Sequence, residues 1–286
     1  MGDDRIDIEQ LMTRLDSQMP YDAEVGASDE LSLLLSDVKR AFITTIEEAR
    51  KGDVQSDALQ SFAKVSIELN ATLVTFNYDD ILDAELYASD SAHRWSPDAG
   101  YGFRCEPSLS SVRGGGYDTG YYTAQAPLLL KLHGSMNWRT RRGYAPPYAL
   151  DAIVHHEDWS TQMTFNEEHY VSFHIAPDQF IVPPILAKSG VSAQPVLRLV
   201  WWLAFRALSE ARRVVFVGYS MPATDIAAKF LFRESIRDPR QIRIVNLAQD
   251  SSESSELERA YRRVFPDLKS EQFDYRGAMS WAMRPG

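Results

Sequence analysis

The chain has 286 residues and a mass of 32.4 kDa, enough for one extended α/β domain or for a main domain with a smaller helical part. Its 40 acidic and 30 basic residues give a net charge of −10, so the chain as a whole lacks the positive charge that binds nucleic acids or anionic membranes. The single cysteine, Cys105, excludes an internal disulfide and a cysteine-based zinc site. The start, MGDDRIDIEQ, has no signal segment and no apolar run is long enough to span a membrane, so we expect a cytoplasmic protein.

The first 70 residues predict helices and no strand. Apolar residues recur at helical spacing in 7–18 and in 29–51. A third helical stretch, 56–70, begins with Ser56, a residue type that favours the N-cap position. We therefore assign residues 1–70 as the helical N-terminal part and residues 71–286 as the main domain.

After residue 70, short apolar runs predict the strands of a parallel sheet that helices cover on both faces. Helical stretches separate several of these runs, and this alternation predicts a doubly wound, Rossmann-like α/β fold. Residues 88–126 and 139–179 interrupt the alternation, and we interpret them as insertions. The predicted strands are 71–77, 127–133, 180–184, 213–220, 241–247 and a weaker 271–276, and the helices between them are 79–87, 195–211 and 225–237.

Polar or small residues stand where three of these strands end. Asn77 ends the first strand, His133 the second, and Gly218 and Ser220 the strand over 213–220. Parallel strands bring their carboxyl ends to one edge of a sheet, where ligands bind, so these residues are expected to converge. A helix that starts behind the Gly218 turn also offers N–H groups to an anion.

The motifs at these strand ends resemble a known series. In chain order, TFNYDD, KLHGSMNW, IVPP with Lys188 after it, VVFVGYSMPATDI and IRIVN resemble sirtuin-like domains. The similarity is greatest to the bacterial branch that hydrolyses NAD in anti-phage defence. It extends over about residues 71–247, and each motif is weak alone, so the specificity comes from five motifs in the same order.

The resemblance implies a set of site residues and a reaction. It implies cleavage of the bond between nicotinamide and ribose, with NAD as the substrate, and the single cysteine implies that no zinc takes part. Asn77 and His133 match the catalytic pair. The matches for NAD binding are Asp79 near the nicotinamide, Gly218 and Ser220 in the phosphate-side turn, and Asn246 near the adenine ribose.

The sequence favours water as the acceptor of the ADP-ribosyl group, so the products are nicotinamide and ADP-ribose. Sirtuin deacetylases carry a four-cysteine zinc module, which a chain with one cysteine cannot form. A second hypothesis is a non-catalytic module that binds NAD or an ADP-ribose derivative in a larger complex, and a third is an NAD-dependent protein deacetylase. The resemblance and the aromatic stretch 117–122 also predict a homo-oligomer, and the resemblance predicts a partner protein in a defence complex. No membrane or nucleic-acid partner is indicated.

Each assignment has a structural alternative. Asn77 and Asp79 are residue types that cap helices, here the helix predicted over 79–87. The structural alternative to a catalytic role for His133 is a histidine at a strand end whose ring nitrogens are satisfied by hydrogen bonds. Trp201 and Trp202 lie in an apolar helix and are expected in the core or in a subunit interface. No metal site is expected, because no pair has a strong ligand spacing among His155, His156, Glu157, Asp158, His169 and His174.

One part of the family pattern is missing. Sirtuin-like domains open with a strand and a glycine-rich loop that wraps the NAD pyrophosphate, and nothing similar precedes DIEQLMTRLD. That strand lies in the middle of a doubly wound sheet, so its absence leaves a slot, expected between 71–77 and the strand near 180. We predict that the slot is filled by sequence upstream of Met1, filled by a strand recruited from elsewhere, or avoided by closing the sheet. Without the loop, affinity for NAD should be poor.

Overall fold

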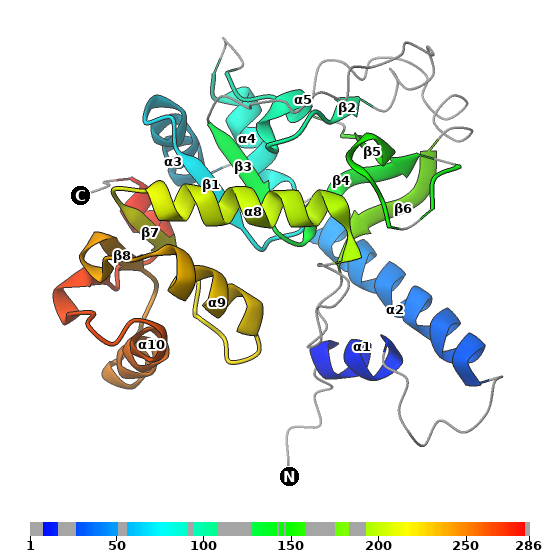
Figure 1. Ribbon diagram of the computed structural model, residues 1–286. Coiled ribbons are helices and arrows are strands. Elements are labelled where there is room, and N and C mark those ends of the chain that lie inside the picture. The colour runs from blue at the N-terminus through cyan, green and yellow to red at the C-terminus, as the bar shows by residue number, and fades with distance from the viewer. Residues whose placement is uncertain are drawn as a thin grey trace.

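The computed structural model has a mixed α/β fold with two groups of parallel strands, a small mixed sheet and helices around them (Figure 1). None of the helices among the described residues is long and apolar enough to cross a membrane. The structure describes residues 8–16, 27–50, 56–90, 94–107, 127–141, 143–145, 147–157, 159, 175–182 and 193–283.

The N-terminal part is helical, as predicted. Helices α1 and α2 pack on each other through a small apolar cluster around Met12, Leu15 and Leu35. Helix α3 begins at its predicted cap, because the backbone N–H of Leu59 donates to Ser56 Oγ over 3.2 Å. It packs against α4 and α11, so it belongs with the rest of the chain rather than with the first two helices. The bounds are α1 Ile8–Asp16, α2 Ala27–Arg50, α3 Asp57–Glu68, α4 Ile81–Ala88 and α11 Ala278–Ala282.

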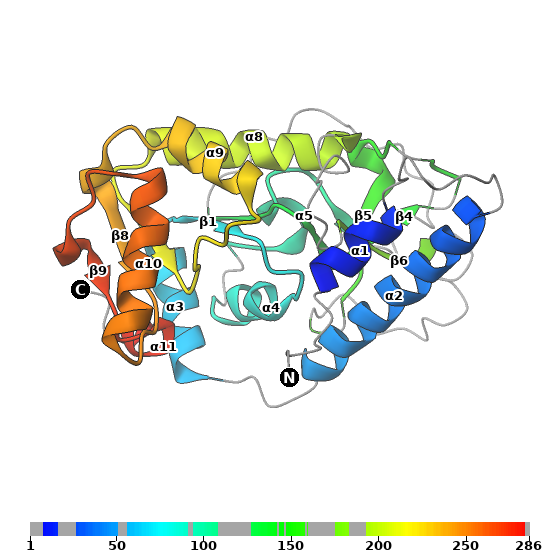
Figure 2. The ribbon, with the colours of Figure 1, turned by 90° about the horizontal axis from the view of Figure 1, so that it is seen from below.

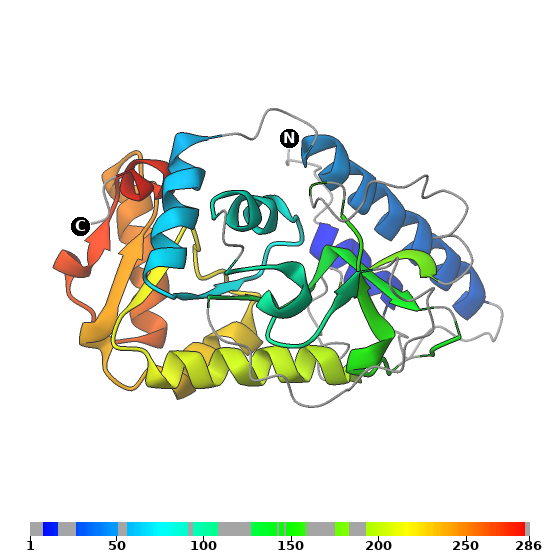
Figure 3. The same ribbon diagram turned by 90° about the horizontal axis from the view of Figure 1, so that it is seen from above.

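The first parallel pair consists of β1 (Thr72–Thr75) and β3 (Leu128–Lys131). Helix α8 (Pro195–Glu210) crosses one face of this pair, and α3 and α4 lie on the other, as the views from below and above show (Figures 2 and 3). The Trp201 indole on α8 donates to the Leu132 carbonyl over 2.8 Å. This bond fixes α8 to the end of β3.

The second parallel group is a three-stranded sheet in the order β7-β8-β9. Helix α9 packs against α8, and α10 packs against α9. Apolar side chains of this sheet, such as Phe216 and Ile244, join those of β3 in one continuous core. The bounds are β7 Val214–Val217, α9 Ile226–Ser235, η3 Pro239–Gln241, β8 Ile242–Val245, α10 Ser251–Val264, η4 Ser270–Gln272 and β9 Phe273–Asp274.

The prediction for the apolar run 180–184 was wrong. Its first residues belong to β6, which pairs antiparallel with β4 in a separate sheet of order β2-β5-β4-β6. The regions interpreted as insertions supply much of this sheet and of its core, including the fully buried Trp95 and Tyr101. The bounds are α5 Pro97–Gly100, β2 Glu106–Pro107, β4 Gly134–Arg141, η2 Leu150–Ala152, β5 Ile153–His155 and β6 Ile175–Ile181.

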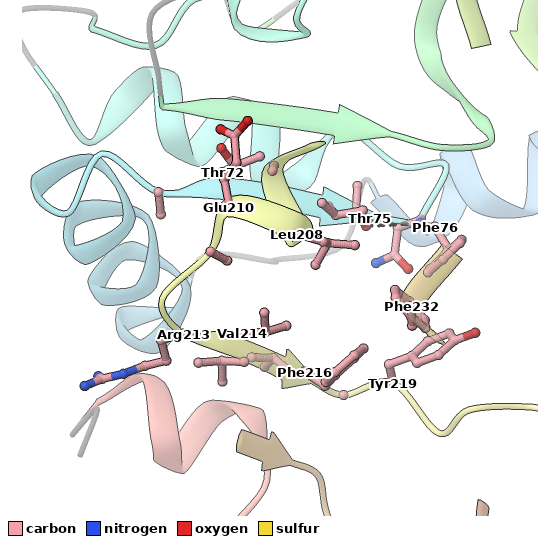
Figure 4. A pocket seen from close by; sticks show the side chains of 18 residues that line it. Thr72, Thr75, Phe76, Leu208, Glu210, Arg213, Val214, Phe216, Tyr219 and Phe232 are labelled. Carbon is pink, nitrogen blue, oxygen red and sulfur yellow. Dashed lines mark hydrogen bonds between the residues drawn. The ribbon is translucent and has the colours of Figure 1, made fainter. Parts of the chain in front are cut away.

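The predicted single sheet is divided. β1 pairs with β3 and β7 pairs with β8, and no described strand lies between β1 and β7. A cleft of about 640 Å³ separates them, lined by both strands (Figure 4). The sheet therefore does not close up. The expected slot exists, but β7 rather than the strand near 180 forms its second wall, since β6 belongs to the other sheet.

Candidate functional site

Asn77 and His133 lie at matching positions beyond the paired strands β1 and β3. The register pairs Thr75 with Lys131, and each candidate residue follows two positions later in its chain. The two segments stay adjacent past the strands, because the Met136 N–H donates to the Tyr78 carbonyl over 2.9 Å. The structure thus brings the two predicted catalytic residues to the same edge.

His133 is enclosed by aromatic rings. Its side chain is 5% exposed, with the Phe76 ring centroid at 5.3 Å and the Tyr78 ring stacked on it at 5.9 Å. The backbone is held as well, since the His133 carbonyl accepts the Val182 N–H over 2.8 Å. Aromatic packing therefore encloses the imidazole just beyond the end of β3, beside Phe76, which lines the cleft, whereas His133 is not among its described lining residues.

Gly134 is required by the close approach of β6. Its φ is +81°, and a Cβ at this position would lie 2.2 Å from the Phe180 carbonyl oxygen. Only glycine allows the chain to turn here from β3 into β4 with β6 alongside.

Asn77 and Asp79 separate into two roles. The Asp79 carboxylate accepts the Ile81 N–H, the first of α4, over 3.2 Å, from the position before the N-cap Asp80, so it is engaged in the start of the helix. Asn77 does not cap the helix. Its backbone N–H donates to Thr75 Oγ1 over 3.1 Å, and its exposed side-chain amide has no hydrogen-bond partner among the described residues. That amide is available to a ligand.

A buried ion pair supports the segment that carries Asn77. Lys131 is fully buried and places Nζ 3.0 Å from Asp83 Oδ2, while it also donates to the Asp79 carbonyl. Tyr101 donates to Asp83 over 2.6 Å, and Asn137 donates to the Tyr101 hydroxyl over 2.8 Å. Burial raises the pKa of Asp83 to about 6, and Lys131 opposes this shift. This network anchors β3 to the start of α4, directly behind the two candidate residues.

The turn after β7 forms the opposite side of the site. Gly218 has a φ of +68°, and a Cβ there would meet nothing within 4 Å. Its exposed backbone therefore leaves room for a ligand to come close, and Ser220 beside it is also exposed. Between them, the Tyr219 ring stacks on Phe76 with centroids 5.2 Å apart. This contact joins the two sides of the cleft.

Two groups near this turn have structural partners. The Asn246 amide donates to the Tyr219 carbonyl over 3.2 Å, and its oxygen accepts the Leu247 N–H over 2.9 Å. Asn246 therefore holds the ends of β7 and β8 together. Asp225, the residue before α9, accepts from the Tyr219 hydroxyl over 2.9 Å and places a carboxylate at the start of that helix. A carboxylate at this position opposes the binding of an anion at the start of α9, where the sequence predicted an anion site.

The sequence interpretation missed three residues of the site. Phe76 and Tyr219 looked like ordinary aromatic residues of strand ends, and nothing local marks them as partners across a cleft. Lys131 gave a signal, since a lysine inside the run LLLKLH is unusual in a buried strand. Its partner Asp83 is 48 positions away, so the sequence did not reveal the pair.

Among the described histidines, His155 has carboxylate partners. His155 lies between two carboxylates, with Nδ1 2.8 Å from Glu157 and Nε2 2.8 Å from Asp98. Among the described residues no group of three or more ligand-type side chains could hold a metal ion. His169 and His174, as well as Asp158, Lys188 and the stretch 117–122, lie outside those residues.

No protein-family model matches the chain, and a search of curated proteins gives no match. The assignment of a function therefore depends on the motifs and on the geometry of the strand ends. The geometry places a free amide and an open glycine turn at the carboxyl end of the cleft, and an enclosed imidazole next to Phe76, one of the residues that line it. Such groups can act as a base, orient a polar substrate and receive a phosphate.

Proposed function

We propose that this chain hydrolyses NAD at the bond between nicotinamide and ribose. The observation that carries the proposal is the alignment of Asn77 with His133, each two residues beyond a pair of strands in register. The proposal treats the two parallel groups as parts of one Rossmann-like sheet, with the substrate across their carboxyl ends. Depletion of NAD in anti-phage defence is the role that the family resemblance supports.

The residues at the strand ends fit the demands of this reaction. When the C–N bond breaks, its electron pair goes to the nicotinamide ring, and positive charge develops on the ribose. A water molecule then forms the new C–O bond and loses a proton. His133 is suited to take that proton, and the free amide of Asn77 can donate to and accept from the water or a ribose hydroxyl. The products are nicotinamide, ADP-ribose and a proton.

The glycine turn suits the phosphate side of the substrate. Gly218 exposes backbone at a positive φ with open space around its Cα, and such turns accept oxyanions. Asp79 and Asn246 are engaged in backbone contacts within the protein. In this proposal they shape the site by holding α4 and the β7–β8 ends.

The direct test measures nicotinamide released from NAD by wild type, Asn77→Ala and His133→Ala. We expect each variant to lose activity on the order of 100-fold or more, because both groups act mainly in the transition state. Thermal melting of each variant checks the fold, since His133 is buried. Equal release by all three proteins would refute the assignment of the pair.

A glycine substitution with a matched control tests the phosphate side. Gly218→Ala and Gly143→Ala both place a side chain at positive φ, and neither Cβ meets an atom within 4 Å. We expect only Gly218→Ala to raise the KM for NAD, by about tenfold, because one lost hydrogen bond or close approach costs roughly 1.4 kcal/mol. Binding of NAD by the wild type without release of nicotinamide would favour the non-catalytic binding module instead.

A further inference from the structure

The cleft between β1 and β7 has the form of a gap in a parallel sheet. Figure 4 shows the arrows of β3, β1 and β7 pointing the same way, with the cleft between the last two. Among the described strands, β1 has a neighbour only in β3, and β7 only in β8. Within the described part of the chain, each strand therefore has one edge that no other strand pairs with, and both of these edges face the same space.

The hydrogen-bond pattern shows which backbone groups point into the cleft. Leu128 donates to the Ala71 carbonyl over 3.3 Å and Leu132 to the Thr75 carbonyl over 3.0 Å. Because successive residues of a strand direct their N–H and C=O groups to alternate sides, those of Thr72 and Val74 face the cleft.

The same alternation applies to β7. Gly218 donates to the Val245 carbonyl over 2.9 Å, on the side of β8. The N–H and C=O groups of Val215 and Val217 are therefore directed toward the cleft. Donors and acceptors on both walls thus have the arrangement that a parallel strand between them would satisfy.

Burial along β1 gives an independent indication. Strands that helices cover on both faces are normally buried throughout, and β1 lies between α8 and the pair α3 and α4 (Figures 2 and 3). All four residues of β1 are nevertheless only partly buried. The exposure comes from the open edge rather than from an open face.

The lining of the cleft favours a peptide strand over a small polar ligand. Its middle is apolar, with Val74, Leu208 and Phe216 among the lining residues. Charged side chains, Glu210 and Arg213, lie at the end from which β1 and β7 start (Figure 4). What remains to be satisfied along the walls is main-chain hydrogen bonding, which an extended chain supplies on both of its sides.

We propose that this cleft binds an extended apolar polypeptide segment from outside residues 1–286, as a strand parallel to β1 and β7. About five residues suffice, because β1 and β7 have four residues each and a strand advances about 3.3 Å per residue. Side chains on both faces of the segment should be apolar and β-branched, since helices cover both faces. A second copy of this chain is a poorer donor, because its described strands are already paired.

This inference goes beyond NAD hydrolysis and does not depend on it. A segment in the cleft would leave at its carboxyl end between Asn77 and Gly218, which both line that space. It would therefore complete the rim of the candidate site as well as the sheet. Its binding is measured without NAD, so failure of the enzymatic proposal leaves this test intact.

The first measurement is amide hydrogen exchange of the protein alone. We expect an alternating pattern, in which the amides of Val74, Val215 and Val217 exchange at least about tenfold faster than those of Thr75 and Phe216. Protection of the cleft amides at every protein concentration would mean that a segment of the chain itself fills the cleft. Protection that grows with protein concentration would mean a second copy. Either result would overturn the proposal.

The second measurement adds a peptide, Lys-Val-Val-Ile-Val-Thr-Lys. We expect it to protect the cleft amides on both walls by about tenfold or more and to raise the melting temperature with concentration. An inserted strand uses amides on both sides, so N-methylation at either of two adjacent central residues should abolish binding. Sensitivity at alternate residues only would indicate addition to a single edge, and absence of binding would also refute insertion.

A substitution in the protein provides the matched control. Val74→Pro removes an N–H that faces the cleft and leaves the bonds to β3 in place, which an edge strand tolerates. We expect it to fold and to lose the peptide, while Val74→Ala, which keeps the amide, retains binding. Equal binding by both variants would contradict a main-chain contact at this position. If Val74→Pro does not fold, the N-methylated peptides decide the question with wild-type protein.

Discussion

The stability of this protein should fall as the pH rises from 6.5 to 8, because of His155. Burial alone would lower the pKa of this imidazole, but its hydrogen bonds to Asp98 and Glu157 outweigh burial and raise the pKa from 6.5 to about 8. A pKa that is higher in the folded state means that folding favours the protonated form. The stabilisation is complete below pH 6.5 and is lost as the pH rises through 8.

The size of the effect follows from the shift. Raising the pKa from 6.5 to about 8 corresponds to about 2 kcal/mol, at roughly 1.4 kcal/mol for each pKa unit. The pair with Glu157 is little screened, since His155 is 1% exposed and the Glu157 side chain is fully buried, but the Asp98 side chain is 45% exposed, so screening of that bond makes about 2 kcal/mol an upper value. For a chain of 286 residues, the melting temperature should fall by about 4 °C.

Urea unfolding at intervals between pH 5.5 and 9 measures this directly, with His155→Gln as the control. The glutamine variant keeps hydrogen-bonding groups and does not titrate, so its free energy of unfolding should vary much less over the same range. The reasoning fails if the wild type is equally stable at pH 6 and pH 9. It also fails if the glutamine variant shows the same loss.

Two further substitutions test the supports of the candidate site. Gly134→Ala should destabilise the protein by about 3 kcal/mol, because it adds left-handed backbone strain and a clash with the Phe180 carbonyl. The control Gly143→Ala, which has no atom near its Cβ, should cost only about 1–2 kcal/mol from backbone strain. Equal losses of unfolding free energy in chemical denaturation would mean that β6 does not crowd Gly134. Lys131→Met should cost about 3–5 kcal/mol at pH 7.5, because it leaves the Asp83 charge buried without its cationic partner, with only the Tyr101 hydroxyl donating to it. The loss should shrink near pH 5, where Asp83 takes up a proton, and in the Lys131→Met/Asp83→Leu double variant; a loss independent of pH would count against a buried ion pair.

The sequence predicted the parallel strands because buried strands are apolar and bounded by turn residues. β1, β3, β7 and β8 were found in this way, and the helix after Ser56 from its cap. Periodicity does not identify the partner of a strand, so the run near 180 was placed in the wrong sheet. β4 was not recognised as a strand, since its sequence GSMNWRTR is polar although Ser135 and Asn137 are buried.

The candidate site was predictable only in part, for a similar reason. The rule that parallel strands end at one edge was enough to associate Asn77 with His133. Contacts between distant segments carry no local signal. The stacking of Phe76 on Tyr219 and the pairing of Lys131 with Asp83 therefore required coordinates.

The Phe76–Tyr219 stack has a consequence for how the width of the site is set. Ladder hydrogen bonds fix neighbouring strands at about 4.8 Å, but no such ladder joins the described strands β1 and β7. Side-chain packing therefore sets the distance between Asn77, the proposed nicotinamide side, and Gly218, the proposed phosphate side. A strand inserted between β1 and β7 would act as a spacer and hold them about two strand spacings apart. If NAD spans the same distance, strand and substrate must each strengthen the binding of the other by the same factor.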